Sequence, residues 1–261
     1  MRLPFWRRRT LSLLSWNVWF GLEKPHRRWT ELLSILGSLQ PDVIALREVT
    51  DPFLGMLRKA PWVRKRYEIS DPTGDLLEGY GNLIVSRLPV ESASVHALDT
   101  EMDRKLVIVE ASAAQGMWAF ASVHLESFRE SADLRRRQLK QVFEALEPYP
   151  DVALMGDFNF CASWTQENNR IPGDYVDVWP AVRADDGFTV DTDLNEMRGR
   201  EAETTKRVRF DRVLIHSGRV TPLDAKLVGT KKIRGEKPAL YPSDHCGLYV
   251  TLRVGDSQAA R

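Results

Sequence analysis

Short apolar segments separated by polar turns run along most of the chain, and their spacing predicts its elements. Continuous apolar runs at residues 11–19 and 43–46 are typical of buried strands. Between these runs, apolar side chains recur every three or four residues, which predicts an amphipathic helix containing Trp29, Leu32, Leu33 and Leu36. This strand–helix–strand order predicts two neighbouring strands of one buried sheet.

In the middle of the chain the spacing of apolar residues becomes typical of short β-strands. Four short segments at residues 82–86, 93–97, 105–111 and 117–123 follow one another closely, a spacing typical of antiparallel hairpins. A second amphipathic helix is predicted after Ser131, because serine is a suitable N-cap and the apolar residues that follow share one helical face.

The last third of the chain opens on a strand at residues 151–159. Residues 161–200 are rich in turn formers, which predicts loops with short elements. Three more strands are predicted at residues 208–215, 223–228 and 247–254, with a basic loop at residues 231–242 before the last of them. The pattern as a whole predicts one α/β domain in which two sheets pack face to face with helices outside.

Composition and charge narrow the class of protein. Hydrophobic residues make up 43% of the 261 residues, and 37 basic residues face 36 acidic ones, so this is an ordinary globular composition without a strong overall charge. The two cysteines form no disulfide or zinc pattern, which favours a reducing compartment. No run is long enough to cross a membrane and no signal peptide is evident. We therefore expect an intracellular protein, cytoplasmic or nuclear, that does not bind membranes.

Polar residues collect at the ends of the predicted strands. Each strand is otherwise apolar, so each polar group needs a partner. If the strand ends converge, they bring together carboxylates, carboxamides and imidazoles from Asn17, Glu48, His124, Asp157, Asn159, Asp211, Asp244 and His245. Asp211 also has a plainer interpretation as an ion-pair partner of Arg209 or Arg212.

This mixture of side chains has a chemical logic. Glu48 and Asn17 offer hard oxygen ligands suited to Mg²⁺ or Mn²⁺, and Mg²⁺ often keeps several waters and shares a substrate phosphate. Histidines beside a phosphate can donate to its oxygens as charge develops. An aspartate that is hydrogen-bonded to a water can activate that water as a nucleophile.

Five short motifs, in order, resemble those of the endonuclease/exonuclease/phosphatase superfamily. They span almost the whole chain: Ser15-Trp16-Asn17, Arg47-Glu48-Val49, the His124 of Val123-His124-Leu125-Glu126-Ser127, Gly156-Asp157-Phe158-Asn159 and Ser243-Asp244-His245. Segments such as Arg209-Phe210-Asp211-Arg212 and residues 187–192 further resemble the tyrosyl-DNA phosphodiesterase 2 family, which removes tyrosine from DNA 5′ ends. The resemblance implies the DNase I-like fold, a four-layer α/β sandwich with two mainly antiparallel sheets.

The resemblance also implies a role for each matching residue. Glu48, with Asn17, would hold the divalent metal, and His124 and His245 would contact the scissile phosphate. Asp157 would align or activate the attacking water and Asn159 would donate to a phosphate oxygen. Asp244 would orient His245, with Asp211 as a supporting carboxylate.

Four positions depart from the animal tyrosyl-DNA enzymes. Trp19, Arg47, Cys161 and Val190 stand where those enzymes carry aspartate, glutamine, arginine and tryptophan. Most of these positions belong to the layer expected to contact substrate. For that layer we predict contributions from Trp19, Phe20, Cys161, Arg212, Lys231 and Lys232.

The sequence therefore predicts a monomeric Mg²⁺-dependent phosphodiesterase that acts on tyrosyl adducts at DNA 5′ ends or on single-stranded DNA. Its catalytic domain would cover residues 11–254, between a basic lead at residues 1–10 and a polar tail at residues 255–261. Two alternatives stay open. One is another activity of the same scaffold: an abasic-site endonuclease, a general nuclease, or a phosphodiesterase for lipids or small phosphates. The other is a non-catalytic nucleic-acid-binding protein.

Overall fold

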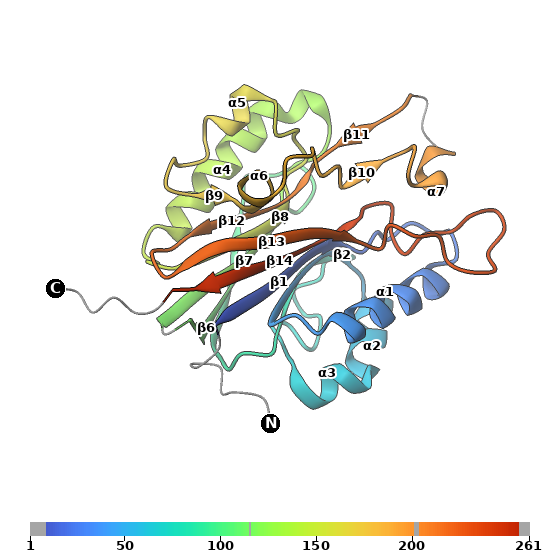
Figure 1. Ribbon diagram of the computed structural model, residues 1–261, viewed down its shortest axis with the longest axis horizontal. Helices are drawn as coiled ribbons and strands as arrows, with labels where there is room; N and C mark the ends of the chain where they lie inside the picture. The colour runs from blue at the N-terminus through green and yellow to red at the C-terminus, as the bar shows by residue number, and fades with distance from the viewer. Residues whose placement is uncertain (1–8, 115, 201–203, 256–261) are drawn as a thin grey trace.

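The computed structural model describes residues 9–114, 116–200 and 204–255, and it shows two six-stranded sheets packed face to face (Figure 1). The first sheet has the order β13-β14-β1-β2-β4-β3. Its strands are β1 (Thr10–Asn17), β2 (Val43–Val49), β3 (Glu68–Ile69), β4 (Gly81–Ser86), β13 (Val220–Val228) and β14 (Gly247–Val254).

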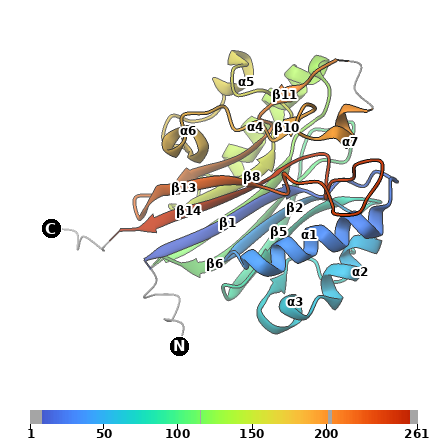
Figure 2. The same ribbon diagram turned by 45° about the vertical axis from the view of Figure 1, so that its right-hand side comes forward.

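The second sheet has the order β5-β6-β7-β8-β12-β9. Its strands are β5 (Val90–Ala97), β6 (Lys105–Ala113), β7 (Gly116–His124), β8 (Val152–Asp157), β9 (Val176–Asp177) and β12 (Asp211–His216). A separate two-stranded ribbon pairs β10 (Val190–Asp191) with β11 (Arg207–Val208), and it projects away from the sheets beside α7 (Glu196–Gly199), as Figure 2 shows.

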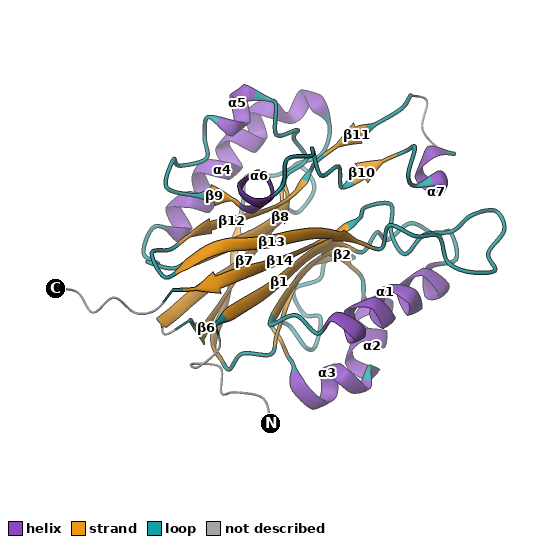
Figure 3. Cartoon of the chain, in the orientation of Figure 1, coloured by secondary structure: helices purple, strands orange, loops and turns teal. Residues whose placement is uncertain are grey.

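Helices cover the outer face of each sheet, so the molecule has four layers (Figure 3). Helices α1 (Pro25–Leu39), α2 (Asp51–Lys59) and α3 (Pro61–Arg66) lie against the first sheet, and α4 (Ala132–Leu146) lies against the second. The short helices α5 (Thr165–Asn168) and α6 (Val178–Val182), and a 3₁₀ turn at Arg129–Ser131, lie in the connections. No helix among these described residues has the length and apolar character to span a bilayer.

The apolar pattern explains these layers. Alternate side chains of one strand point to opposite faces, so on β1 Leu13 enters the core between the sheets while Leu14 packs under the helices. The core between the sheets includes Trp118 and Phe120, which stack with ring centroids 5.8 Å apart. Because both faces of the central strands are buried, those strands are apolar almost throughout.

Each sheet contains one parallel pair, and these pairs position the polar strand ends. β1 and β2 are parallel and joined through α1, and β7 and β8 are parallel and joined through α4. Parallel strands end at the same edge of a sheet, so Asn17 pairs in register with Arg47, and His124 pairs with Asp157. Since the two sheets pack face to face, the two edges meet.

The predicted fold class, a four-layer sandwich of two mainly antiparallel sheets, is confirmed. Several local predictions differ from the structure. The strands predicted at residues 11–19 and 151–159 end earlier, at Asn17 and Asp157, and the strand predicted at residues 43–46 continues to Val49. The strand predicted at residues 208–215 is divided into β11 and β12, the strand predicted at residues 223–228 begins at residue 220, and Ser131 is the N-cap of α4 but makes no side-chain cap hydrogen bond. Most of the predicted lead and tail lie outside the described residues, so the predicted domain bounds stay predictions.

Gly156 is required by the close approach of β7 and β8. A Cβ atom there would lie 2.6 Å from both Cγ1 and the carbonyl oxygen of Val123, and a carbonyl cannot move without disturbing the sheet. We expect Gly156→Ala to lower the free energy of unfolding by about 1–3 kcal/mol in urea denaturation. The matched control is Gly55→Ala in α2, where nothing lies within 4 Å and alanine favours the helix. Equal stability of the two variants would contradict this account.

Candidate active site

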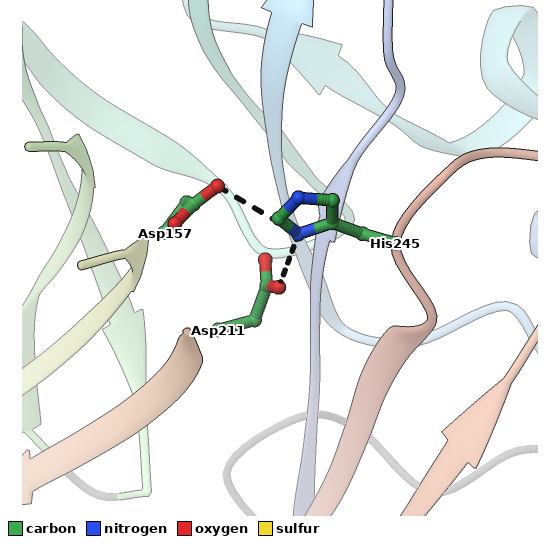
Figure 4. Close-up of side chains that lie close together, drawn as sticks. All are labelled: Asp157, Asp211 and His245. Carbon is green, nitrogen blue, oxygen red and sulfur yellow. Dashed lines mark hydrogen bonds and ion pairs between the residues drawn. The ribbon is translucent and has the colours of Figure 1, made fainter. Parts of the chain in front are cut away.

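Asp157, Asp211 and His245 form a buried cluster between the two sheets (Figure 4). Nδ1 of His245 lies 2.7 Å from Oδ2 of Asp211 and 3.7 Å from Oδ2 of Asp157. Asp211 and Asp157 pair in register on β12 and β8, while His245 comes from the segment before β14 in the other sheet. The cluster therefore joins the two halves of the fold.

The carboxylates around His245 determine its charge. Burial by itself would lower the pKa of His245, but Asp211, Asp244 and Asp157 outweigh burial and raise this pKa to about 10. Burial likewise opposes ionisation of Asp211, and His245 and Arg47 lower the pKa of Asp211 below its usual value. His245 is thus an imidazolium at neutral pH, with Nδ1–H donating to Asp211 and Nε2–H left for another acceptor.

His124 has the opposite character. Burial and the neighbouring Arg104 hold the pKa of His124 well below its ordinary value, so its ring is neutral. Nη1 of Arg104 lies 2.8 Å from Nδ1 of His124, which makes Nδ1 the acceptor and puts the ring proton on Nε2. Nε2 lies 3.6 Å from Oδ2 of Asp157. Arg104 belongs to none of the motifs recognised in the sequence, and only the fold brings it to His124.

Asn17 and Glu48 lie beside this cluster at the ends of β1 and β2. Nδ2 of Asn17 donates to Oε1 of Glu48 at 2.9 Å and to Oδ2 of Asp157 at 3.2 Å. The register of β2 against β4 shifts between Leu46 and Val49, and Glu48 has φ of +56°, which strains a residue with a side chain. This irregularity re-aims the Glu48 carboxylate at the strand end.

The donor set around Glu48 fits a divalent cation. Burial raises the pKa of Glu48 to about 6, and the negative charges of Asp244 and Asp157 add to the rise. A cation bound to Glu48 would offset this repulsion, and carboxylate oxygens suit Mg²⁺ or Mn²⁺. Asp157, Asp211 and His245 are also close enough for a metal site, but Nδ1 of His245 is already bonded to Asp211, which leaves Glu48 as the stronger candidate ligand.

Two of the predicted contacts are made by other atoms. Nδ1–H of His245 donates its hydrogen bond to Asp211 and not to Asp244. The carboxylate of Asp244 instead lies 3.8 Å from Nε of Arg198. Asp211 is the partner of Arg47 and His245, whereas Arg209 and Arg212 pair with Asp177. The interpretation of Asp211 as an ion-pair partner of Arg209 or Arg212 is therefore wrong, and its carboxylate instead orients His245.

Asn159 follows β8 with φ of +54°, and hydrogen bonds hold both its backbone N–H and its side-chain Nδ2. Its backbone N–H donates to Oδ1 of Asp157 at 3.0 Å. Its Nδ2 donates to the carbonyl oxygen of Leu125 at 2.9 Å and to Oγ of Ser127 at 3.3 Å.

A cleft of about 690 Å³ opens onto this cluster and carries basic and aromatic side chains. Glu48, His124, Asp157, Asn159 and His245 all line it. The remaining lining includes cations and aromatic rings that were not among the predicted substrate contacts: Phe128, Arg129, Trp164, Arg198, Lys206 and Phe210. Such side chains are the usual contacts for a phosphate backbone and for unpaired bases.

The residues predicted to contact substrate are mostly placed elsewhere. Arg212 is buried, where its guanidinium binds Asp177 and Oδ1 of Asn168. Lys232 pairs with Glu196, and Sγ of Cys161 accepts a hydrogen bond from Ser163. None of Cys161, Arg212, Lys231 and Lys232 is among the residues lining the cleft in the part of the chain that the structure describes.

Trp19 and Phe20 follow β1 close to the candidate metal ligands. The backbone N–H of Phe20 donates to Oε2 of Glu48 at 3.3 Å, and that of Trp19 donates to Oδ1 of Asn17 at 3.0 Å. The Arg28 guanidinium covers the Trp19 ring at 4.3 Å, and this half-buried ring packs against an apolar cluster with Ile233 and Leu240. Phe20 is 43% exposed and its ring lies 4.9 Å from that of Tyr80. Of the two, Phe20 is the side chain with a ring face open to a ligand.

The charge on His245 predicts a pH dependence of stability. Its pKa is about 10 in the folded chain against an ordinary 6.5, so protonation stabilises the fold fully below about pH 6.5 and progressively less as the pH rises to 10. We expect the free energy of unfolding to fall by about 3–5 kcal/mol over this window. Urea denaturation across that range measures the slope. His245→Gln should flatten it, and an unchanged slope in that variant would contradict the assignment.

Comparisons with known proteins agree with this geometry. Residues 14–245 match the Endonuclease/Exonuclease/phosphatase family. The chain is 30% identical to tyrosyl-DNA phosphodiesterase 2 of Homo sapiens over 257 residues, which cover 93% of this chain and 68% of that protein.

Solved structures give the same result. Danio rerio tyrosyl-DNA phosphodiesterase 2 complexed with single strand DNA product superposes with a TM-score of 0.82 at 26% identity, covering 94% of this chain and 99% of that one. The Caenorhabditis elegans protein gives 0.77 at 26% identity, covering 94% and 75%. The chain therefore belongs to the endonuclease/exonuclease/phosphatase family, and within that family it is similar to tyrosyl-DNA phosphodiesterase 2.

Proposed function

We propose that this protein hydrolyses 5′-phosphotyrosyl bonds at DNA ends with the help of Mg²⁺. The observation that carries the proposal is the convergence of Glu48, Asp157 and His245 in one cleft, in a chain 30% identical to a tyrosyl-DNA phosphodiesterase. A divalent metal held by Glu48, with Asn17 orienting that carboxylate, supplies polarisation of a phosphate oxygen and offsets charge on the leaving group. Mn²⁺ fits the same ligands.

Asp157 is the proposed base. Its carboxylate lies at the centre of the site, and in this role it takes a proton from the attacking water. The substrate phosphodiester has two non-bridging oxygens. The His245 imidazolium donates Nε2–H to one of them, and neutral His124 and Asn159 supply further donors to this pair of oxygens. The tyrosyl phenolate leaves as a comparatively good leaving group, so no dedicated strong acid is required.

The cleft supports single-stranded DNA as the other part of the substrate. Arg129, Arg198 and Lys206 line it together with the rings of Phe128 and Trp164. Cations that follow the backbone and rings that stack on bases are the recurring features of single-strand binding. We expect the protein to act as a monomer inside the cell, where DNA ends arise.

A second activity within the same family is favoured by one observation. Val190 is buried in the cleft wall where the animal enzymes carry tryptophan, so one of their aromatic contacts is absent at this position. A phosphodiester with a smaller or differently shaped group, such as an abasic site or a small phosphate, would need this contact less.

One substrate panel separates the two activities. Purified protein with Mg²⁺ receives single-stranded DNA with a 5′-phosphotyrosine, duplex DNA with an abasic site, and bis(p-nitrophenyl) phosphate. We expect release of tyrosine from the first at a kcat/KM at least about tenfold above the others. Asp157→Asn from the same preparation controls for contaminating nucleases. Undetectable tyrosine release at enzyme levels that cleave another member of the panel would refute the proposal.

A further inference from the structure

Arg47 is a fully buried arginine at the irregular end of β2. Its Nη1 donates to Oγ of Ser15 at 2.8 Å and to the carbonyl oxygen of Ala45 at 2.9 Å. Its Nη2 donates to Oδ1 of Asp211 at 2.6 Å. Both Arg47 and Asp211 have no exposed surface, so this ion pair is isolated from solvent.

The ion pair joins the two sheets at the site. Arg47 and Ser15 belong to the first sheet, and Asp211 begins β12 of the second. The two oxygens of Asp211 are divided between two cations, with Oδ1 bound to Arg47 and Oδ2 bound to Nδ1 of His245. Arg47, Asp211 and His245 thus form a continuous buried relay of charged hydrogen bonds, which we call the Arg47 relay.

The bonding around Arg47 is directed at Asp211 and is otherwise incomplete. Its Nε is buried and has no hydrogen-bond partner among the described residues. Nε of Arg87, in the buried pair with Asp42, is likewise unpartnered, so this open donor does not set Arg47 apart. What sets Arg47 apart is the 2.6 Å bond from its Nη2 to Oδ1 of Asp211, a carboxylate whose other oxygen holds the His245 ring.

We propose that Arg47 is a positioning residue that acts through Asp211 on His245. Its guanidinium, anchored on Ser15 and Ala45, fixes the plane of the Asp211 carboxylate, and the other oxygen of that carboxylate fixes the His245 ring. The consequence is that Nε2 of His245 faces the scissile phosphate in one orientation. The proposal rests on the proposed phosphodiesterase function and adds a residue that does not itself contact the substrate.

A double-mutant cycle tests this connection. Arg47→Met removes the guanidinium, Asp211→Asn removes the acceptor, and the third variant combines both. If Arg47 acts through Asp211, Arg47→Met lowers kcat about 10- to 100-fold with KM within about threefold, because a small displacement of a catalytic ring has effects of that size. Asp211→Asn lowers kcat further, and the combined variant is no slower than Asp211→Asn alone.

A spectroscopic readout needs no substrate. In protein labelled with ¹⁵N-histidine, the Nδ1 proton of His245 is expected as a downfield resonance because it is bonded to a buried carboxylate, and His245→Gln identifies it by its loss. Arg47→Met should shift or broaden this resonance. The matched control is Arg87→Met, which breaks the buried Arg87–Asp42 pair at the opposite end of β2. That variant should lose stability yet keep both kcat and the resonance.

Each outcome decides a separate question. Independent, multiplicative effects of Arg47→Met and Asp211→Asn, or a folded Arg47→Met with normal kcat and an unchanged resonance, would overturn the relay. If Arg47→Met does not fold, Arg47→Lys replaces it, since lysine keeps the positive charge but lacks the planar fork whose separate nitrogens bind Ser15 and Asp211. The same two readouts apply. If wild-type protein cleaves only bis(p-nitrophenyl) phosphate, the tyrosyl-DNA function fails while the cycle is completed on that substrate.

Discussion

Asp157→Asn is expected to lower kcat on 5′-phosphotyrosyl DNA by about 10³-fold or more, which is the upper range for removal of a general base. The carboxylate accepts from the backbone N–H of Asn159 through Oδ1 and from Nδ2 of Asn17 through Oδ2. An amide at this position has only one acceptor oxygen, so its NH₂ group must face one of these donors. The substitution therefore removes both the base and the hydrogen bonds that aim it.

Single-turnover kinetics with saturating DNA measure this effect on the chemical step. Circular dichroism and urea denaturation establish that the variant is folded. The control is Asp151→Asn at the start of the same strand, whose carboxylate binds Ser217 and Arg219 far along β8 from the cleft. That variant should lose stability and keep its turnover. An Asp157→Asn protein with a wild-type rate would remove Asp157 from the mechanism.

The layers of the fold could be predicted because burial of one face of a strand or helix gives its apolar residues a regular spacing in the sequence. Leu13 and Leu14 alternate between the two faces of β1, and α1 shows the 3.6-residue period, so two buried sheets with outer helices were predictable. The strand ends were also predictable, since polar residues that terminate apolar strands are conspicuous. Which strand ends meet was harder to predict from the sequence, because it depends on how the two sheets face each other.

The roles of individual partners required the fold. Asp244 adjoins His245 in the chain, but the two residues lie in a bend before β14, and Nδ1 of His245 bonds to Asp211, 34 residues away in sequence. Arg104 precedes β6 in no recognisable motif, yet it fixes the tautomer of His124. Lys231 and Lys232 formed a conspicuous basic pair, whereas the cations lining the cleft come from three separate segments, at Arg129, Arg198 and Lys206, which only the fold brings together.

The metal assignment makes the second large prediction. Glu48→Gln is expected to reduce turnover by about 10³-fold at millimolar Mg²⁺, because a carboxamide is a much weaker ligand for a hard cation than a carboxylate. The same substitution should increase stability in the metal-free protein. The pKa of Glu48 is about 6 in the folded chain against an ordinary 4.5, so its ionisation opposes folding above about pH 6.

The sign of this effect distinguishes a metal ligand from a structural acid. A carboxylate whose folded pKa is raised contributes stability fully below about pH 4.5 and loses it as the pH rises through about 6. At pH 7.5 without metal, Glu48→Gln should therefore raise the free energy of unfolding by about 1–2 kcal/mol. It keeps the acceptor for Nδ2 of Asn17, since glutamine retains one side-chain oxygen.

Added Mg²⁺ should reverse the order of stability. A cation that binds only the folded wild type stabilises it in proportion to the logarithm of its concentration, whereas the variant gains little. Thermal denaturation with and without Mg²⁺ measures both effects in one experiment. If metal stabilised the two proteins equally, Glu48 would not be the principal ligand. If metal-free Glu48→Gln were less stable than the wild type at pH 7.5, Glu48 would stabilise the fold by itself. The carboxylate would then be a structural acid and not a metal ligand.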